Sequence, residues 1–286
     1  MIIVKIIGGL GNQMFQYAFA KALEKRGNNV KIDISTYDNY KLHGGYQLDL
    51  YNIDLRISTK EENAHYISNN FFSFFFMNLG FNFSKKTKEK SLLFDKTLLS
   101  LGNNQYVEGY FQSEKYFIDI RDIIINQFTI KDDLSNYSKS ILNLIITSKN
   151  SCSVHVRRGD FVNEINQKIH GSCSLKYYIT AMQKIQKIRK KTKFFVFSDD
   201  VNWCRENLKL ENVIIINNNE KRIPHEDIHL MSLCDDNIIS NSTFGWWGAW
   251  LNQNKFKTVI APNRWFSNEK LELQSKFIVC NDWIKI

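Results

Sequence analysis

The chain opens with an apolar stretch, a polar loop and an amphipathic segment, in that order. Residues 2–7 are almost continuously apolar and predict a strand, and residues 8–13 form a glycine-rich loop. Apolar residues then recur at helical spacing from Met14 to about Gly27, where glycine is expected to end the helix. Residues 29–34 predict a second strand. Such a βαβ unit implies a parallel sheet covered by helices.

The same pattern starts again in the second half of the chain. Residues 152–156 predict a strand, and residues 157–160 its exit loop. Further strands are predicted at 193–198, 213–216, 237–240 and 258–261, and helices at 175–190, 203–208, 226–234 and 243–251. Strands and helices that alternate over short connections are typical of doubly wound α/β domains. We therefore predict two Rossmann-type domains, residues 1–148 and 149–286, with a central cleft between the carboxyl ends of their strands.

The middle of the chain is less regular. Residues 106–111 predict a strand, and Ser113 is a candidate cap of a helix that runs to about Gln127. Residues 71–83 are strongly aromatic and are followed by several lysines up to Lys90. A buried helix is the default interpretation of this aromatic segment, and a patch that binds an anionic lipid surface is the alternative.

The composition is that of an ordinary globular protein. Of the 286 residues, 43% are hydrophobic and 23% are charged, which provides enough apolar material for two cores and excludes wholesale disorder. No apolar run reaches the ~18 residues of a transmembrane helix, and the first residues lack the basic leader of a signal peptide. The five cysteines include no C-x-x-C pair and indicate neither a disulfide framework nor a zinc site. We expect a cytoplasmic protein that can associate peripherally with the inner face of the cell membrane.

The chain is basic, with 38 Lys+Arg against 29 Asp+Glu residues and a formal net charge of +9. Net charge alone indicates solubility and nonspecific attraction to anions. Many lysines are scattered among Asn and Ile, as in residues 187–193 and 217–221, which favours a compositional bias over a dedicated nucleic-acid groove. Anionic small molecules and a membrane surface are equally compatible partners.

The first loop partly matches a dinucleotide-binding fingerprint. Gly9 and Gly11 provide its G-x-G, and Asp33 lies near the end of the second predicted strand, where an acid that binds ribose would be. Met14 occupies the position of the third glycine, and its side chain would hinder the approach of a pyrophosphate. A strand-to-helix turn without any phosphate contact is the equally weighted alternative.

The segment from His155 to Asp160 carries a sharper signal. Side chains alternate along a strand, so His155 and Arg157 share one face. Two adjacent guanidinium groups at the end of a strand, with Gly159 permitting a tight exit, form a candidate anion site, because arginine binds phosphate bidentately and stays charged. In the alternative, Arg158 pairs with Asp160 and only anchors the loop. We expect one structural and one functional arginine, the latter being Arg157.

Polar residues also follow two later predicted strands. Asp199 and Asp200 could bind a base or a ribose. Metal ligation is the less favoured interpretation, because no other metal-ligating residue stands at a chelating spacing nearby. For Asp200, the N-cap of the following helix is the alternative. Residues 241–243 open a helix whose N-terminus favours anions, with N-capping by Ser242 or Thr243 as a compatible alternative. The nearby indoles are expected mainly in the core: Trp246, Trp247, Trp250 and Trp265.

Four motifs, taken together and in this order, resemble the bacterial α1,2-fucosyltransferases. They are residues 8–17, 109–113, 155–160 and 235–247, and they span nearly the whole chain. Jointly these motifs are specific, whereas each one alone would not be. Phe161 stands where the family commonly has tyrosine, a change that leaves the chemistry untouched.

The resemblance implies a GT-B-like α/β fold, with an acceptor-side first domain and a second domain that binds GDP-fucose. It implies inverting transfer of L-fucose to the 2-hydroxyl of a terminal galactose, with no metal or other cofactor. Arg157 would hold the diphosphate, His155 would contact the nucleotide, and Asp199 would read guanine or ribose. Asn12 would lie near the reacting sugar, and Asp160 is the candidate base. The full set of candidates is Arg157, Asn12 and Asp160 for catalysis, and His155, Arg158, Gly9, Gly11, Gln13, Asp199, Asn241, Ser242, Thr243 and Phe244 for substrate binding.

Three rival interpretations are compatible with parts of the sequence. An NAD-dependent oxidoreductase would rest on Gly9, Gly11 and Asp33 but leaves the two arginines unexplained. A nucleic-acid binder would show a steep salt dependence of its affinity, yet the sequence has no such motif beyond its charge. A transferase of the same architecture could make another linkage or use another donor sugar. As acceptor, the resemblance suggests a galactose in an O-antigen or a lipid-linked oligosaccharide, and it predicts no nucleic-acid partner.

Overall fold

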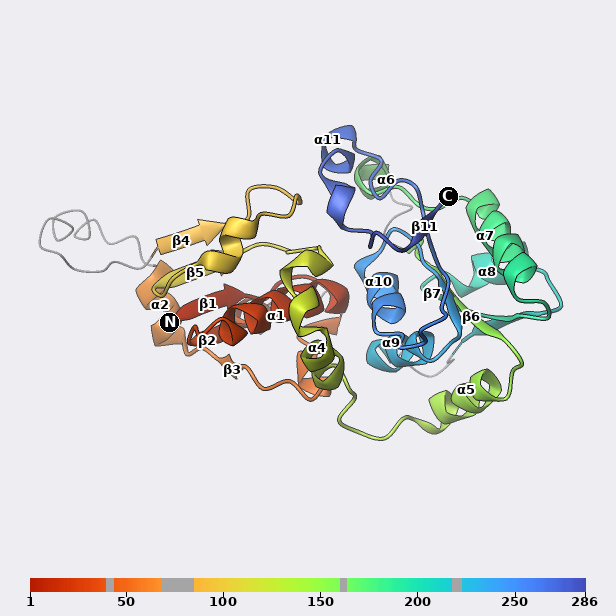
Figure 1. The fold of residues 1–286 in the computed structure, drawn as a ribbon, viewed down its shortest axis with the longest axis horizontal. Coiled ribbons are helices and arrows are strands. Elements are labelled where there is room, and N and C mark those ends of the chain that lie inside the picture. Colours follow the sequence, from red (N-terminus) through yellow and green to blue (C-terminus); the bar gives the residue numbers. More distant parts are fainter. Residues whose placement is uncertain (40–43, 68–84, 160–163, 218–222) are drawn as a thin grey trace, which may run out of the picture. The chain divides into compact units, whose positions relative to one another are not determined.

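The structure is a computed structural model in which the chain forms two compact units, Met1–Thr129 and Ile130–Ile286 (Figure 1). Each unit contains one parallel sheet with helices packed on it. The structure describes residues 1–39, 44–67, 85–159, 164–217 and 223–286. Within these ranges, no helix is both long enough and apolar enough to cross a membrane.

The first unit is built on a five-stranded sheet in the order β3-β2-β1-β5-β4. Its strands are β1 (Ile2–Lys5), β2 (Val30–Asp33), β3 (Arg56–Ile57), β4 (Lys85–Lys88) and β5 (Gln105–Glu108). Its α-helices are α1 (Leu10–Lys25), α2 (Lys60–Ile67) and α4 (Arg121–Gln127). Helix α1 connects the parallel neighbours β1 and β2 and is buried along most of its length, which confirms the predicted βαβ unit.

The second unit has a six-stranded sheet in the order β11-β10-β9-β6-β7-β8. Its strands are β6 (Ser151–Val156), β7 (Lys193–Ser198), β8 (Val213–Ile216), β9 (Asp236–Ile238), β10 (Val259–Ala261) and β11 (Ile284–Lys285). Read from β8, the strands of this unit follow the order 3-2-1-4-5-6 of doubly wound folds. The winding reverses between β6 and β9. The carboxyl ends of these two strands therefore flank the place where such folds bind their ligands.

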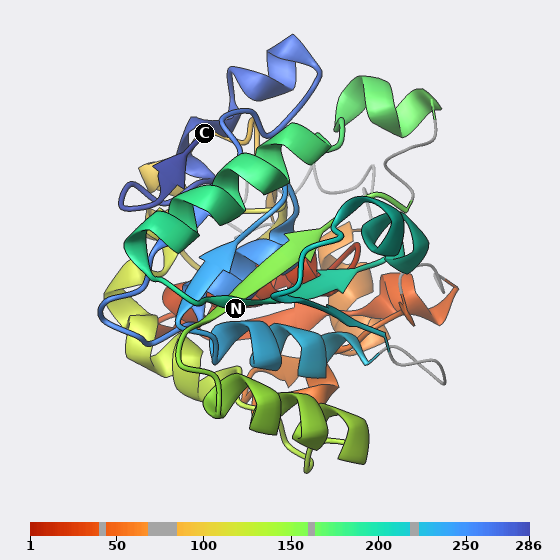
Figure 2. The same cartoon turned by 90° about the vertical axis from the view of Figure 1, so that its right-hand side faces the viewer.

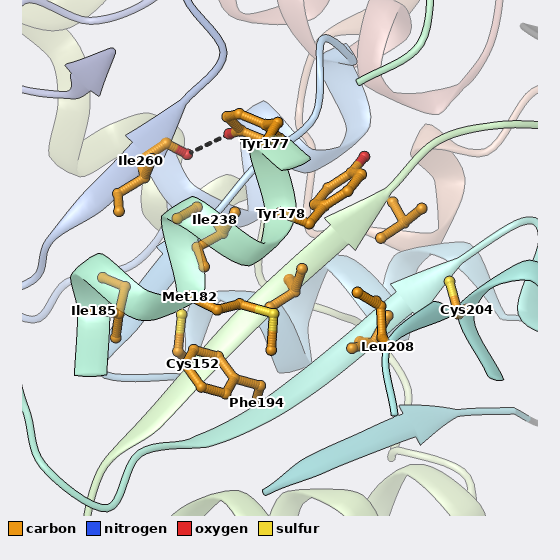
Figure 3. Packing of buried hydrophobic residues seen from close by; sticks show 14 residues of the cluster. Cys152, Tyr177, Tyr178, Met182, Ile185, Phe194, Cys204, Leu208, Ile238 and Ile260 are labelled. Carbon is orange, nitrogen blue, oxygen red and sulfur yellow. Dashed lines mark hydrogen bonds between the residues drawn. The ribbon is translucent and has the colours of Figure 1, made fainter. Parts of the chain in front are cut away.

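One face of the second sheet is covered by an apolar cluster. The helices of this unit are α5 (Asn136–Ile146), α6 (Glu164–Ile169), α7 (Leu175–Ile188), α8 (Val201–Asn207), α9 (Pro224–Ser232), α10 (Thr243–Trp250) and α11 (Glu269–Glu272). Cys152, Val154 and Val156 of β6 pack under α7 and α8, in the alternation expected of a strand (Figure 3). Tyr177 of α7 donates its hydroxyl to the carbonyl of Ile260, at 3.3 Å. This bond fixes α7 over the switch between β6 and the strands beside it.

The opposite face of the same sheet carries buried polar side chains. In Figure 2, α7 lies on one side of the sheet, and α9 and α5 lie on the other. Ser153 accepts a hydrogen bond of 2.7 Å from Asn237, which also donates to the carbonyl of Met231 in α9 at 2.8 Å. Asn252 donates to the side-chain oxygen of Asn237 at 2.8 Å. These bonds satisfy polar groups whose burial would otherwise be costly, and His155 faces this side as well.

The boundary between the two units lies earlier in the sequence than predicted. The second unit begins at Ile130, whereas the predicted domain boundary followed residue 148. The reason is that α5 packs against α9. The carboxylate of Glu226 accepts hydrogen bonds from the backbone N–H and the hydroxyl of Ser135, at 2.7 Å each, and so fastens the start of α5.

The chain between the first sheet and α5 also differs from the prediction. In place of one helix from Ser113 to Gln127, it forms two short 3-10 segments followed by α4. Phe117 has φ −144°, which is not helical and interrupts the predicted helix. Ser113 caps the first 3-10 segment. Residues 71–83, for which a core helix or a lipid-binding patch was predicted, lie outside the described residues.

Candidate functional site

Two of the sequence motifs meet where the second sheet changes its direction of winding. Arg157 and Arg158 follow β6, and the chain after β9 runs through Asn241 into α10. Strands β6 and β9 are parallel neighbours, paired from Cys152 to Asp236 onward. The two loops therefore leave the same edge of the sheet side by side. The structure thus places the arginine pair and the start of α10, two features that the sequence predicted to favour anions, after neighbouring strands of one sheet edge.

His155 is held rigidly between the two loops. Its side chain is buried, and its Nδ1 shares a hydrogen bond of 2.8 Å with the hydroxyl of Ser240. The ring of Phe244 lies 5.4 Å from the imidazole, centroid to centroid. A Cβ built on Gly245 would come within 2.6 Å of Nδ1 of His155. Glycine at this position therefore lets the first turn of α10 approach the imidazole.

Asp199 binds both arginine residues of the loop after β6. Its Oδ1 accepts a hydrogen bond of 2.8 Å from the backbone N–H of Arg158, and its Oδ2 lies 2.8 Å from Nη1 of Arg157. The second contact is an ion pair whose geometry is not that of a hydrogen bond. A Cβ on Gly159 would lie 2.7 Å from the same Oδ2. These contacts show that Asp199 positions the loop after β6, and its predicted contact with guanine or ribose stays a prediction.

Arg158 is engaged by the first turn of α8. Its Nε lies 3.2 Å from Oδ2 of Asp200, and its guanidinium carbon lies 4.3 Å from the centroid of a Trp203 ring, a cation–π contact. Asp200 also accepts a hydrogen bond of 3.0 Å from the backbone N–H of Trp203, which confirms the predicted N-cap. Arg158 therefore pairs with Asp200, and its predicted pairing with Asp160 stays a prediction. Asp160, the predicted partner and candidate base, lies outside the described residues.

The start of α10 is fixed by its cap and by the residue before the cap. Ser242 accepts a hydrogen bond of 3.3 Å from the backbone N–H of Phe244, which confirms the predicted N-cap, and Thr243 is the first helical residue. The side-chain amide of buried Asn241 donates to three backbone carbonyls, those of His170, Gly171 and Trp265. Asn241 thus ties neighbouring loops together, and its predicted substrate contact stays a prediction. The predicted core position of the indoles is confirmed.

In the first unit, the glycine-rich loop after β1 is stabilised by a buried glutamine. Gly8 has φ +81°, a left-handed conformation that favours glycine. The amide of Gln13 donates to the carbonyls of Gly8 and Gly45, at 3.0 and 2.8 Å. Its oxygen accepts from the backbone N–H of Gln47 at 3.0 Å. Gln13 is fully buried and holds the loop itself, and its predicted role in substrate binding stays a prediction.

Asn12 lies in the first turn of α1 and is positioned from the neighbouring strand. Its Oδ1 accepts a hydrogen bond of 2.9 Å from the amide of Gln112, in the loop that follows β5. Gly9 is the N-cap of α1 without a side-chain bond, and Gly11 lies inside the first turn. The loop after β1 and the loop after β5 are therefore joined at Asn12. The predicted roles of Asn12, Gly9 and Gly11 stay predictions.

The carboxylate of Asp33 is buried and bonded inside the first unit, away from the solvent that a ribose would come from. It accepts hydrogen bonds from the backbone N–H of Ser35 at 2.8 Å, the amide of Asn63 at 2.7 Å and the hydroxyl of Tyr106 at 2.5 Å. Met14, at the position of the third fingerprint glycine, is also completely buried. The NAD interpretation therefore loses the acidic residue on which it depends.

Three residues of these two loop systems were not assigned a role from the sequence. Trp203 lies under Arg158, Ser240 bonds His155, and Gln112 bonds Asn12. The position of Trp203, three residues after its capping aspartate, was a local signal that could have been used. The contacts of Ser240 and Gln112 depend on which strands are neighbours, which the local pattern does not give.

Proteins of similar sequence include two from Escherichia coli. The alpha-1,2-colitosyltransferase is 34% identical over 301 aligned positions, which cover 100% of this chain and 99% of that protein. The O-antigen biosynthesis glycosyltransferase WbnK is 32% identical over 305 positions, which cover 98% of each chain. Galactoside alpha-(1,2)-fucosyltransferase 1 of Leontopithecus chrysomelas is 28% identical over 154 positions, or 51% of this chain and 42% of that protein.

The solved structures and a family model agree with these relatives. The crystal structure of NodZ alpha-1,6-fucosyltransferase soaked with GDP-fucose has a TM-score of 0.55 at 14% identity, covering 87% of this chain and 91% of that chain. This likeness, with the two parallel sheets, confirms the predicted GT-B-like α/β fold. The model of glycosyl transferase family 11 matches residues 1–286. The chain therefore belongs to glycosyl transferase family 11.

Proposed function

We propose that this family 11 enzyme transfers L-fucose from GDP-fucose to the 2-hydroxyl of a terminal galactose, with inversion at C1 of the fucose. The names of two relatives support a 1,2 linkage, and one of them supports fucose and a galactoside acceptor. The observation that carries the proposal is that the loop of Arg157 and the loop that leads into α10 leave neighbouring strand ends, with buried His155 bonded to Ser240 and 5.4 Å from the ring of Phe244. A guanidinium and a helix N-terminus are groups that bind a nucleoside diphosphate.

The proposed chemistry depends on how the departing diphosphate is stabilised. Cleavage of the bond between C1 of fucose and the β-phosphate oxygen places negative charge on that phosphate while the sugar becomes oxocarbenium-like. Preorganised donors directed at such an oxygen supply several kcal/mol of transition-state stabilisation. Asp199 restricts the conformation of the Arg157 side chain before any substrate is bound. The guanidinium therefore loses little conformational entropy during the reaction itself. This arrangement supplies positive charge without a divalent cation.

The remaining roles concern the sugar and the acceptor. Asn12 is proposed to lie near the reacting sugar, and His155 to contact the nucleotide. The acceptor hydroxyl loses its proton late in a loose transition state, so the candidate base Asp160 contributes little in this proposal. The name of WbnK supports an O-antigen glycan as acceptor. Such an acceptor would place the enzyme in the cytoplasm, at the inner face of the membrane.

A second donor is favoured by one specific observation. A relative that matches the whole chain is named a colitosyltransferase. Colitose is L-fucose without its 3-hydroxyl, so the two donors differ by one polar group. A site that hydrogen-bonds a hydroxyl rejects the deoxy analogue by about 10⁴–10⁵, whereas a site without such a bond accepts both. The ratio of the two kcat/KM values therefore decides which donor this enzyme uses.

The proposal is tested with the purified full chain. GDP-fucose and the GDP derivative of colitose are each incubated with a panel of galactosides, with lactose as a surrogate acceptor, in the presence and absence of EDTA. The linkage of each product is then determined by NMR. We expect an α1,2-fucosylated galactoside whose yield EDTA does not change. Transfer of colitose alone would overturn the assignment of GDP-fucose as donor. A product with another linkage would overturn the proposed α1,2 transfer, and loss of turnover in EDTA would overturn the metal-free mechanism.

A further inference from the structure

A second charged surface of the second unit lies at the amino edge of its sheet. It comprises residues 146–151, 187–193 and 253–257, which precede strands β6, β7 and β10. We call these three segments the basic rim. They contain no acidic residue, and their basic residues are Lys149, Lys187, Arg189, Lys190, Lys191, Lys193, Lys255 and Lys257. The candidate site lies at the carboxyl edge of the same sheet, so the two surfaces are at opposite ends of its strands.

Hydrogen bonds to backbone carbonyls join the three segments into one surface. Lys193 donates its N–H to the carbonyl of Asn150 at 2.9 Å, and the amide of Asn150 donates to the carbonyl of Lys190 at 2.9 Å. Arg189 donates through Nη2 to the carbonyl of Phe256 at 2.6 Å. The segments at 146–151 and 253–257 are therefore both attached to the turn between α7 and β7.

Most of the charge on the rim is available to a partner. Arg189 is used within the fold, because its Nε lies 2.8 Å from the buried carboxylate of Asp236. Lys257 donates to the carbonyl of Ala249 in α10 and to that of Asn252. Six exposed lysines form no ion pair with any described residue: Lys149, Lys187, Lys190, Lys191, Lys193 and Lys255. Lys191 also has φ +61°, at the tip of the turn, where a lysine is strained.

Exposed apolar side chains lie among these lysines. The exposed fraction is 83% for Phe256, 67% for Ile146 and 53% for Ile188. Phe256 is not at the end of a loose loop, since the side chain of Asn254 accepts its N–H at 2.9 Å and Arg189 binds its carbonyl. The loop therefore presents Phe256 to solvent beside the exposed lysines.

We propose that the basic rim docks on a membrane surface rich in anionic phospholipid. Lysines attract the headgroups, and Phe256, Ile188 and Ile146 enter the boundary between headgroups and acyl chains. The choice of a lipid surface over a nucleic acid rests on the residue types. Nucleic-acid sites favour arginines that bind phosphate bidentately and grooves whose aromatic rings stack on bases. The rim instead has lysine ammonium groups between single exposed apolar side chains. This surface would hold the enzyme at the membrane without using any residue of the candidate site.

The test measures cosedimentation of the full chain with lipid vesicles. One set contains phosphatidylcholine with about 30 mol % phosphatidylglycerol, and the other contains phosphatidylcholine alone. A charge variant carries Lys190→Gln, Lys191→Gln and Lys255→Gln, and an apolar variant carries Phe256→Ser and Ile188→Ser. We expect wild-type protein to bind the anionic vesicles only. The charge variant should bind them roughly a hundredfold less well, and the apolar variant at least about tenfold less well.

Matched variants separate the rim from general effects of charge and apolar surface. The control for charge carries Lys25→Gln, Lys96→Gln and Lys270→Gln at exposed positions outside the rim, and the apolar control carries Ile57→Ser and Leu273→Ser. Both should bind vesicles like wild type, and all variants should keep wild-type turnover with a soluble galactoside. Equal loss in the controls, equal binding to both vesicle sets, or no binding to either would overturn the proposal. Binding of duplex or single-stranded oligonucleotides without vesicle binding would overturn it in favour of a nucleic-acid surface.

Discussion

Substitution of Gly245 by alanine tests how closely α10 must approach the candidate site. The added Cβ would lie 2.6 Å from Nδ1 of His155, and ordinary contact begins at 3.4 Å, so the two groups must separate by about 0.8 Å. The imidazole cannot yield easily because it is buried and bonded to Ser240. Overpacking of this kind costs about 1–3 kcal/mol, and the better helix propensity of alanine returns about 1 kcal/mol. We expect a net loss of about 1 kcal/mol of unfolding free energy.

The same displacement should weaken donor binding more than it weakens the fold. A misplacement near 1 Å at a binding group can reduce activity about 10²-fold. If His155 contacts the nucleotide, Gly245→Ala should therefore raise the Kd for GDP by about 10-fold to 10²-fold, with a similar loss in kcat/KM for the donor.

Gly248 provides the matched control on the same helix. A Cβ at this position would lie 2.8 Å from the Cβ of Met231 in α9, so Gly248→Ala introduces comparable crowding away from His155. It should lower the melting temperature by a similar amount, about 2–4 °C per kcal/mol, and leave the affinity for GDP unchanged. Thermal unfolding and isothermal titration with GDP measure both quantities on both variants. Wild-type affinity in Gly245→Ala, or equal loss of affinity in Gly248→Ala, would refute the reasoning.

Three further predictions concern single residues. Arg157→Ala should lower kcat/KM by about 10²–10³ or more while circular dichroism stays unchanged, and near-wild-type turnover would remove the proposed electrostatic mechanism. Asn12→Ala should lower kcat strongly and GDP affinity only modestly in steady-state and binding assays; the reverse pattern would move Asn12 from the reaction centre to donor binding. Burial raises the pKa of Glu226, but hydrogen bonds from Ser138 and Ser135 outweigh burial and hold the pKa below 4.5. The stability that Glu226 contributes is therefore complete above its unfolded pKa and is lost as pH falls through the folded one. Urea unfolding across the acid range should show a larger loss for wild type than for Glu226→Gln, and identical slopes would argue against this assignment.

Much of the fold could be predicted because the signals are local. The apolar strands at 2–7 and 193–198 and the periodic helices after them depend on residues close in sequence. The site was partly predictable for a related reason: in a parallel sheet, strand ends such as Val156 and Ile238 lie at one edge, so the residues that follow them gather. That these two ends are neighbours follows only from the order of the strands, which the local pattern of residues does not give.

Contacts that the sequence did not predict share a physical cause. Amide side chains such as Gln13 and Asn241 occur in motifs that suggest ligand contact, yet they bond the backbone of loops distant in sequence. The contact of Asp199 with the nucleotide stays a prediction, and the structure adds that its carboxylate binds the guanidinium of Arg157 and the backbone N–H of Arg158 in the neighbouring strand's loop. A side chain at a strand end has the same local sequence in both cases. What decides its role is a partner that only the folded sheet supplies.

In the second unit, two arginines lie at the carboxyl edge of the sheet, and the exposed lysines of the basic rim lie at its amino edge. At the carboxyl edge, Arg157 and Arg158 are each held by an aspartate, and their charges act over short distances in a half-buried site. At the amino edge, the exposed lysines of the basic rim have no acidic partner among the described residues, so their field extends into solvent and is screened within about 10 Å at 0.1 M salt. As composition alone, the net charge of +9 indicates only a bias towards basic residues. In the structure, the arginines act on a ligand at short range, whereas the exposed lysines attract anions from a distance. Rising salt should release the enzyme from anionic vesicles well before it weakens the binding of GDP. Parallel decline of both would mean that one surface binds both partners.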